Sequence, residues 1–218
     1  LLAHLEATGE DRHTLVIFTC DHGEMLGDHF MWGKEGYFDQ AYYIPLIIRD
    51  PRSAADGGRG KVIGEFTEAI DLMPTILEWL GLDVPAQCDG ESLLPFLEGA
   101  NPAGWRQEAH WEYDFRDPVQ RRSENALGLA DEQCGIAVLR GHRYKYVHFT
   151  ALPPLLFDLE KDPDELVNRA EDPAYRGIRL DYANKMLSWR MTHADRTLAS
   201  RFITERGVVE RAGPRRAR

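Results

Sequence analysis

Two short apolar runs enclose a polar, glycine-rich segment in the first quarter of the chain. Residues 15–19 and 44–49 have the continuous hydrophobic character that is typical of strands covered on both faces. Residues 20–36, between them, have the composition of loop and short helix. We therefore predict a buried parallel sheet with its chemistry at the carboxyl edge, where ligands of open α/β sheets bind.

Hydrophobic spacing predicts helices and one further extended piece in the first half. Residues 1–9 and 71–80 carry apolar side chains at helical spacing, and a glycine follows or ends each run. A shorter helix is expected within residues 90–99, and residues 62–68 are expected to include a short strand or an extended piece. Together with the two apolar runs, these elements predict an α/β architecture.

The pattern changes after residues 101–106, which have the composition of a linker. Four short β-type runs follow, and Gly141 and His142 predict a tight hairpin between the second and the third. An amphipathic helix is expected over residues 175–193. The predicted strands are residues 110–113, 134–139, 144–149 and 155–159. We predict two domains: a main α/β domain, residues 1–105, and a small antiparallel α+β domain with its helix and tail, residues 106–218.

Charge and cysteine content narrow the possible partners. The chain has 26 Lys and Arg against 36 Asp and Glu, a formal net charge of -10, which argues against a nucleic-acid partner. No apolar run approaches the roughly 18 residues of a membrane span, so no membrane partner is expected. Three widely spaced cysteines do not form a disulfide framework, which favours a reducing cytoplasm. An anionic substrate would need a local positive site.

Asp21 and His22 directly follow the first apolar run and are the candidate metal ligands. Neighbouring side chains of a strand point to opposite faces, so this pair can share one ion only where the strand has ended. Gly23 allows such a bend because it tolerates unusual dihedrals. The alternatives are a helix cap for Asp21 and a packed, hydrogen-bonded imidazole for His22. Carboxylate and imidazole together suit manganese, zinc or iron, whereas calcium prefers oxygen ligands.

Lys34 is the candidate catalytic cation. It lies between Gly33 and Gly36, which let the backbone come close to a ligand. A divalent ion together with this lysine would give the positive site that an anionic substrate needs. The alternative is a solvated surface lysine, the usual fate of this residue type.

Several motifs, in one order, resemble the sulfatase and phosphonate monoester hydrolase family of the alkaline phosphatase superfamily. The resemblance begins at TCDHGEMLGDH and extends to about Asn168. HWEYDFRDP is most similar to the phosphonate monoester hydrolase branch. The remaining matches are G-K, P-L-I-I, TEAIDLMPTILEWLGL, CDGESLLPFLEG and LFDLEKDPDELVNRAEDP. Motifs found in this order are more specific than the D-H-G tripeptide alone.

The resemblance implies a fold and an activity. The expected fold is the C-terminal part of an alkaline-phosphatase-like sheet sandwich plus a small four-stranded antiparallel α+β subdomain. The expected activity is hydrolysis of sulfate, phosphate-diester or phosphonate monoesters. Asp21 and His22 would hold one divalent ion, Mn²⁺ or Ca²⁺, since many members use calcium. Lys34 would bind a non-bridging oxygen or stabilise the leaving group. The arginine-rich end, residues 201–218, is a frayed tail or an arm that docks on another subunit of a homo-oligomer.

The family's nucleophile is missing from this sequence. Members carry it early, as formylglycine on a C-x-P-x-R or S-x-P-x-R motif, and none of Cys20, Cys88 and Cys134 begins such a motif. Leu1 is not an initiator methionine. We expect the chain to be the C-terminal part of a longer enzyme and to be inactive alone. The alternatives are an inactive metal-binding or structural remnant, or a phosphodiesterase of the same superfamily with a serine or threonine nucleophile.

Overall fold

The computed structural model describes residues 1–85, 87–193, 201–205 and 207–210. Contacts between the residues divide the chain into two compact units. One comprises residues 1–19, 46–105 and the described residues from 192 on, and the other comprises residues 20–45 and 106–191. The predicted division into residues 1–105 and 106–218 stays a prediction. The contacts group residues 20–45, which hold the candidate site, with the later half of the chain.

The first unit contains a two-stranded sheet of β1 (Val16–Thr19) and β2 (Leu46–Arg49). The strands pair antiparallel, with Phe18 opposite Ile47, so the predicted parallel sheet is wrong for this pair. Apolar runs report burial but carry no information about strand direction. The described residues do not cover both faces of this sheet, because Phe18 and Ile47 are 61% and 64% exposed; the predicted cover on both faces stays a prediction.

Helices and loops complete the first unit. The predicted helices at residues 1–9 and 71–80 are confirmed as α1 and α3. No strand forms within residues 62–68; instead the carbonyl of Phe66 accepts a hydrogen bond from Trp105 Nε1 at 2.7 Å. A side-chain donor thus satisfies this carbonyl outside any strand. The helices are α1 (Leu2–Thr8), η1 (Glu10–Arg12), η3 (Ser53–Gly57), η4 (Ala69–Asp71), α3 (Leu72–Trp79) and α4 (Leu94–Leu97).

The end of the chain is described only in part. Residues 201–210 include β7 (Arg201–Thr204) and β8 (Gly207–Glu210), which pair antiparallel. Residues 211–218, the rest of the predicted tail or docking arm, lie outside the described residues. Docking on another subunit stays a prediction. Among the helices of the described ranges, none is both long and apolar enough to cross a bilayer.

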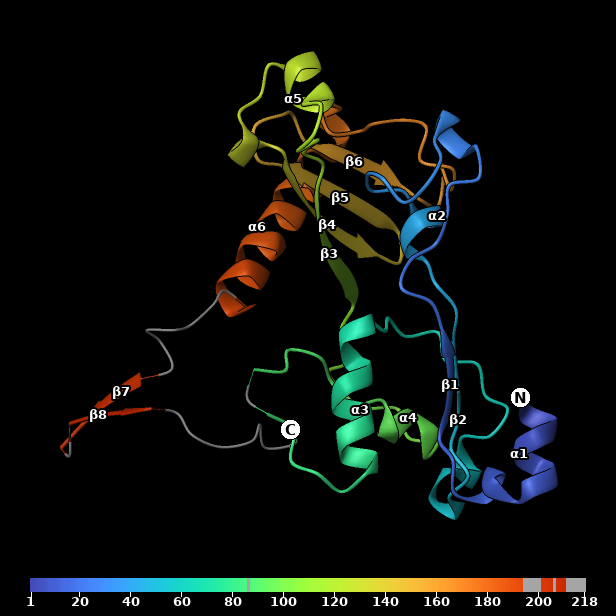
Figure 1. Ribbon diagram of the computed structural model, residues 1–218. Coiled ribbons are helices and arrows are strands. Elements are labelled where there is room, and N and C mark those ends of the chain that lie inside the picture. Colours follow the sequence, from blue (N-terminus) through green and yellow to red (C-terminus); the bar gives the residue numbers. More distant parts are fainter. Residues whose placement is uncertain (86, 194–200, 206, 211–218) are drawn as a thin grey trace. The chain divides into compact units, whose positions relative to one another are not determined.

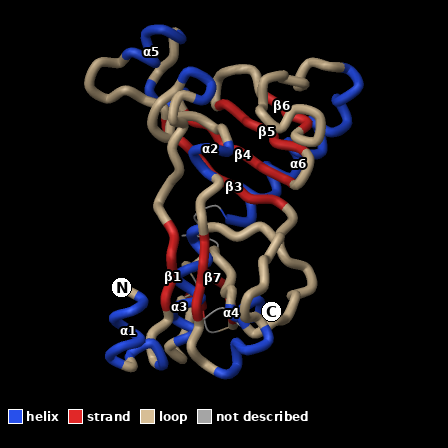
Figure 2. The backbone as a smooth tube through the Cα atoms, turned by 90° about the vertical axis from the view of Figure 1, so that its right-hand side faces the viewer, coloured by secondary structure: helices blue, strands red, loops and turns tan. Residues whose placement is uncertain are grey.

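The second unit is built on a four-stranded antiparallel sheet with the order β3-β4-β5-β6 (Figures 1 and 2). This confirms the predicted small antiparallel subdomain. The strands are β3 (Glu108–Asp114), β4 (Gly135–Gly141), β5 (Tyr144–Phe149) and β6 (Leu155–Asp158). The helices are η2 (Asp28–Phe30), α2 (Asp39–Tyr42), α5 (Arg122–Leu127), η5 (Asp131–Gln133), η6 (Pro173–Tyr175) and α6 (Arg176–His193).

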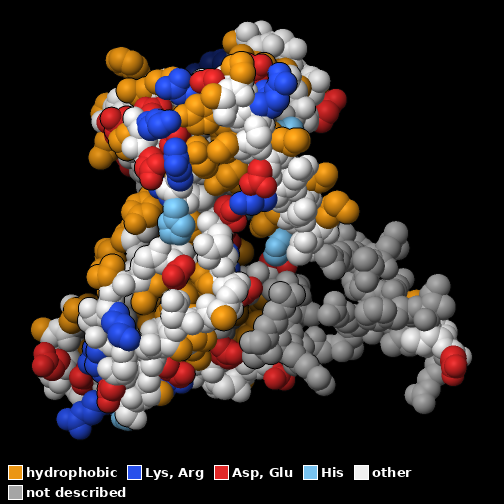
Figure 3. Space-filling view, turned by 180° about the vertical axis from the view of Figure 1, so that it is seen from behind, with side chains coloured by type: hydrophobic (Ala, Val, Ile, Leu, Met, Phe, Trp, Pro, Cys, Tyr) orange, Lys and Arg blue, Asp and Glu red, His pale blue; other side chains and the backbone are white. Residues whose placement is uncertain are grey.

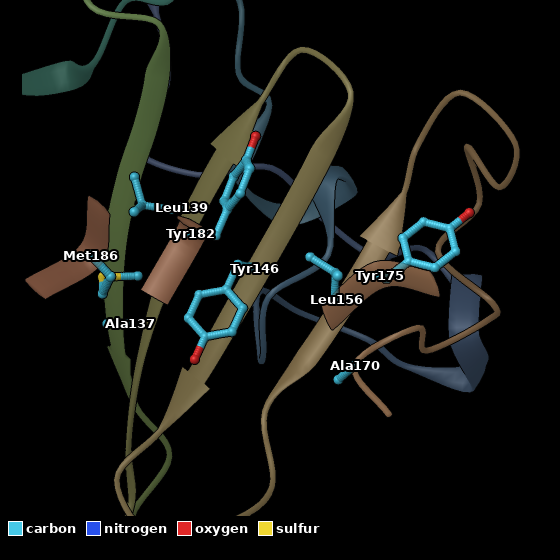
Figure 4. Packing of buried hydrophobic residues seen from close by; sticks show 8 residues of the cluster. All are labelled: Ala137, Leu139, Tyr146, Leu156, Ala170, Tyr175, Tyr182 and Met186. Carbon is cyan, nitrogen blue, oxygen red and sulfur yellow. The ribbon is translucent and has the colours of Figure 1, made fainter. Parts of the chain in front are cut away.

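Different segments cover the two faces of this sheet. The long helix α6 packs on one face, where Tyr182 and Met186 meet side chains of the strands (Figure 4). On the other face Val138, Val147 and Phe157 form a cluster to which Tyr37 of the segment 20–45 contributes. The segment that carries the candidate site is therefore part of the core of this unit. On the face seen in Figure 3, the molecule's acidic and basic side chains are intermixed.

Candidate active site

The candidate site lies on residues 20–45, a segment whose two limbs are hydrogen-bonded to each other. Gly23 N donates to Ala41 O at 2.8 Å, and Glu24 N donates to Gln40 O at 3.2 Å. A Cβ atom at Gly23 would lie 2.1 Å from the carbonyl oxygen of Gln40. Gly23 is thus required for close backbone approach. Gly23 is not among the glycines with positive φ, so the close approach, and not a left-handed backbone, is what the structure shows to require glycine here.

Asp21 and His22 leave the end of β1 and turn to the same side. The Nε2 atom of His22 lies 3.7 Å from Oδ2 of Asp21, as expected if the regular strand has ended at Thr19. Asp21 is exposed, with 86% of its side chain accessible, whereas His22 is half-buried. The structure thus brings the two predicted metal ligands together.

A backbone carbonyl fixes the ring of His22. Nδ1 donates to Gly23 O at 2.6 Å, so the proton of the neutral imidazole is on Nδ1. This leaves the lone pair of Nε2 on the side of the Asp21 carboxylate. Metal-binding histidines commonly donate their second ring N–H to such a partner, which fixes both tautomer and orientation.

The two side chains fit part of a divalent metal site. An imidazole nitrogen and a carboxylate oxygen on one side of the loop form a donor pair that manganese, zinc and iron accept. Within the described ranges, no group of three or more His, Cys, Asp or Glu side chains is placed to hold a metal ion. The metal role of the pair stays a prediction, in which Asp21 and His22 would supply two of the ligands.

Lys34 lies on the opposite limb of the same segment, and its side chain is exposed. Its carbonyl oxygen accepts a hydrogen bond from the Tyr42 hydroxyl at 3.4 Å. Among the described residues, no carboxylate lies within 4.0 Å of its ammonium. Its neighbour Gly33 is tied to the limb that carries His22, because Gly33 O accepts from Met25 N at 2.9 Å. The anion-binding role of Lys34 stays a prediction.

Glu24 is a structural residue of the site that sequence reasoning missed. Its Oε1 atom accepts hydrogen bonds from the backbone N–H groups of Leu26 and Gly33, the second of them short. The carboxylate thereby closes the loop between the two limbs. No sequence signal marks this contact, because its partners are backbone groups that any residue provides.

Backbone strain is concentrated in the same loop. Leu26, His29 and Phe30 have φ values of 49°, 51° and 60°, in the left-handed region that side chains other than glycine rarely adopt. The ring of His29 stacks on Phe38, with centroids 3.6 Å apart. Strained residues persist where the surroundings determine their conformation, and they cluster at functional sites.

The sequence also matches known proteins. Residues 27–192 match the family model described as N-sulphoglucosamine sulphohydrolase, C-terminal. The multifunctional alkaline phosphatase superfamily protein PehA of Trinickia caryophylli is 49% identical over 211 residues, covering 97% of this chain and 41% of the relative. An arylsulfatase of Clostridium perfringens is 32% identical over 190 residues, covering 85% of this chain and 35% of the relative.

The fold of the chain is also similar to solved structures. The phosphonate monoester hydrolase of Agrobacterium radiobacter matches with a TM-score of 0.88 and 50% identity, over 97% of this chain and 42% of that structure. SpPMH of Silicibacter pomeroyi matches with a TM-score of 0.87 and 41% identity, over 96% and 41%. The chain spans about two fifths of the length of these relatives. It belongs to the sulfatase and phosphonate monoester hydrolase family of the alkaline phosphatase superfamily, and it corresponds to the C-terminal part of the family's members.

Proposed function

We propose that this chain is the C-terminal part of a metal-dependent hydrolase of phosphonate monoesters, phosphate diesters or sulfate esters. The observation that carries the proposal is the pair Asp21–His22 at the end of β1, with Nε2 turned toward the carboxylate. Among the ester classes we place phosphorus esters first. The identity to a phosphonate monoester hydrolase is 50%, against 32% to an arylsulfatase.

The role of each side chain follows from charge. A sulfate, phosphate or phosphonate ester is anionic and repels a nucleophile, and a bound Mn²⁺ or Ca²⁺ ion supplies positive charge that offsets this repulsion. Asp21 would bind the ion through a carboxylate oxygen and His22 through Nε2. The carbonyl of Gly23 holds the ring of His22 in the required tautomer. Lys34 would bind a non-bridging oxygen of the ester or stabilise the leaving group.

The nucleophile is proposed to come from a part of the protein that precedes these residues. We assign it as formylglycine, since the family places this group on an earlier motif and the 218 residues contain no C-x-P-x-R or S-x-P-x-R sequence. The coverage of about 41% of PehA is consistent with this arrangement. On this proposal the isolated chain does not turn over, and the longer protein does.

The test is hydrolysis of an aryl phosphonate monoester and of an aryl sulfate by the longer protein, after chelation and after return of Mn²⁺. We expect activity that depends on the metal and is lost in Asp21→Asn and His22→Gln. Lys34→Ala should lower kcat/KM on the order of 100-fold, the usual cost of removing one stabilising group from a transition state.

Matched controls separate these roles from general damage. Asp28 belongs to a second Asp-His dipeptide in the same segment, and Lys61 is an exposed lysine elsewhere. Asp28→Asn and Lys61→Ala should keep wild-type rates. Full metal-dependent activity in His22→Gln, or clear turnover by the isolated 218-residue chain, would contradict the proposal.

A further inference from the structure

Lys145 carries a charge in the interior of the second unit. It lies on β5, and its side chain is fully buried. By strand alternation it shares a face with Val147, which is the face that residues 20–45 cover. Its ammonium pairs with Asp39 Oδ1 at 2.6 Å, pairs closely with Glu165, and donates to Tyr37 O at 3.0 Å. Two carboxylates and a backbone carbonyl thus surround the ammonium.

Asp39, the first residue of α2, is held at several points. Its Oδ1 atom faces Lys145, and its Oδ2 atom accepts from Arg140 at 3.1 Å. Its backbone N–H donates to Glu165 Oε2 at 3.1 Å. Glu165 is itself buried and has a left-handed φ of 54°, so a strained residue is retained where it can reach both Asp39 and Lys145.

A short series of contacts links Asp39 to the candidate metal ligands. The next two residues, Gln40 and Ala41, present the carbonyls that accept the N–H groups of Glu24 and Gly23. The carbonyl of Gly23 then accepts Nδ1 of His22. Each step is one hydrogen bond or one or two peptide units, so displacement of Asp39 should displace the ring of His22.

We infer that Lys145, with Asp39 and Glu165, forms a positioning centre that holds the Asp21–His22 pair in its metal-binding geometry. The inference rests on the proposed function for what the pair binds, whereas the contacts of the centre are independent of it. Lys145 acts through Asp39 and the loop rather than on a substrate. Removing one member of a buried ion network leaves an uncompensated charge, so the members hold one another in place.

The hairpin of β4 and β5 provides a matched pair of arginines for the test. Arg140 pairs with Asp39 of the site segment, and Arg143 pairs with Asp158 of β6 at 3.1 Å. We compare Arg140→Gln with Arg143→Gln by amide hydrogen exchange of Gly23 and Glu24, normalised to amides of β4 and β5. Exchange in Arg140→Gln should be about tenfold faster, in line with loss of a hydrogen bond to a charged group, and Arg143→Gln should match wild type.

A second readout follows the site itself. Broadening of the His22 ring signals by Mn²⁺ alone should require a roughly tenfold higher concentration in Arg140→Gln, and Arg140→Lys should restore part of the response. Lys145→Met should increase amide exchange at Gly23 and Glu24 more than Arg140→Gln does. If Lys145→Met does not fold, the comparison of Arg140→Gln with Arg143→Gln still tests the inference. Equal exchange at Gly23 in Arg140→Gln and Arg143→Gln would overturn the inference. If exchange is faster in Arg140→Gln but Mn²⁺ has no effect on wild-type His22, the positioning role of the centre would be supported and the metal role of His22 would be overturned.

Discussion

At the scale of single residues, His22 shows how one backbone oxygen selects the chemistry of a side chain. The hydrogen bond from Nδ1 to Gly23 O leaves Nε2 as the available lone pair, beside the carboxylate of Asp21. An imidazole with Nε2 protonated could not serve as a ligand through that atom. The proposed metal role thus depends on the position of a peptide group, and not only on residue type.

Asp158 allows a prediction about pH. Its side chain is buried, and hydrogen bonds from Arg143 and from the hydroxyl of Tyr175 hold the pKa of Asp158 below its usual value. A carboxyl whose pKa is lower in the folded state adds stability above its unfolded pKa and loses it as the pH falls through the folded pKa. The urea midpoint of wild type should therefore exceed that of Asp158→Asn near pH 7, and the gap should narrow below about pH 4. A gap that widens toward low pH would contradict this linkage.

At the scale of elements, the sequence predicted the four-stranded sheet well because its strands bury one cluster on each face. The segments 110–113, 134–139, 144–149 and 155–159 lie within or within one residue of β3 to β6. The hairpin prediction was right for a different reason. The turn falls at His142 and Arg143, and a Cβ at Gly141 would lie 2.3 Å from the Tyr182 hydroxyl. Packing against α6, which local patterns do not encode, therefore favours glycine here, because a larger residue would have to displace the ring of Tyr182.

The features that the sequence did not predict depend on contacts between residues far apart in the chain. Apolar runs carry no information about the direction of β2 relative to β1. Local patterns also do not encode long-range contacts such as that of Lys145 with Asp39. Adjacency and the end of an apolar run were enough to predict that Asp21 and His22 converge. Hydrophobic periodicity did not predict that Glu24 joins the two limbs by accepting a hydrogen bond from Gly33, or that Lys145 is a buried charged residue.

Gly23→Ala tests the close approach of the two limbs. The added methyl group would lie 2.1 Å from the carbonyl oxygen of Gln40, and a backbone atom has little freedom to move. We expect a loss of about 1–3 kcal/mol in the free energy of unfolding, the typical cost of overpacking, together with loss of metal binding at His22. Gly64→Ala is the matched control, because no atom lies within 4 Å of its added methyl group and its φ is ordinary. Equal urea midpoints for the two variants would refute the role given to Gly23.

At the scale of the whole molecule, the chain is two fifths of its relatives in length, and its described residues include two candidate metal ligands, Asp21 and His22. The exposed, register-paired side chains of Phe18 and Ile47 leave an apolar face on the sheet of β1 and β2. Both features agree with the proposal that an earlier part of the protein supplies further ligands and the nucleophile.

Metal content of the longer protein tests the central claim most directly, because it does not depend on knowing the ester. We expect one Mn²⁺ per wild-type molecule. Asp21→Asn and His22→Gln should bind it more than about 100-fold more weakly, because loss of a ligand costs more than the roughly 10- to 100-fold loss that follows from removing a ligand's support. Asp28→Asn should bind as wild type does. Wild-type affinity for Mn²⁺ in His22→Gln would contradict the account.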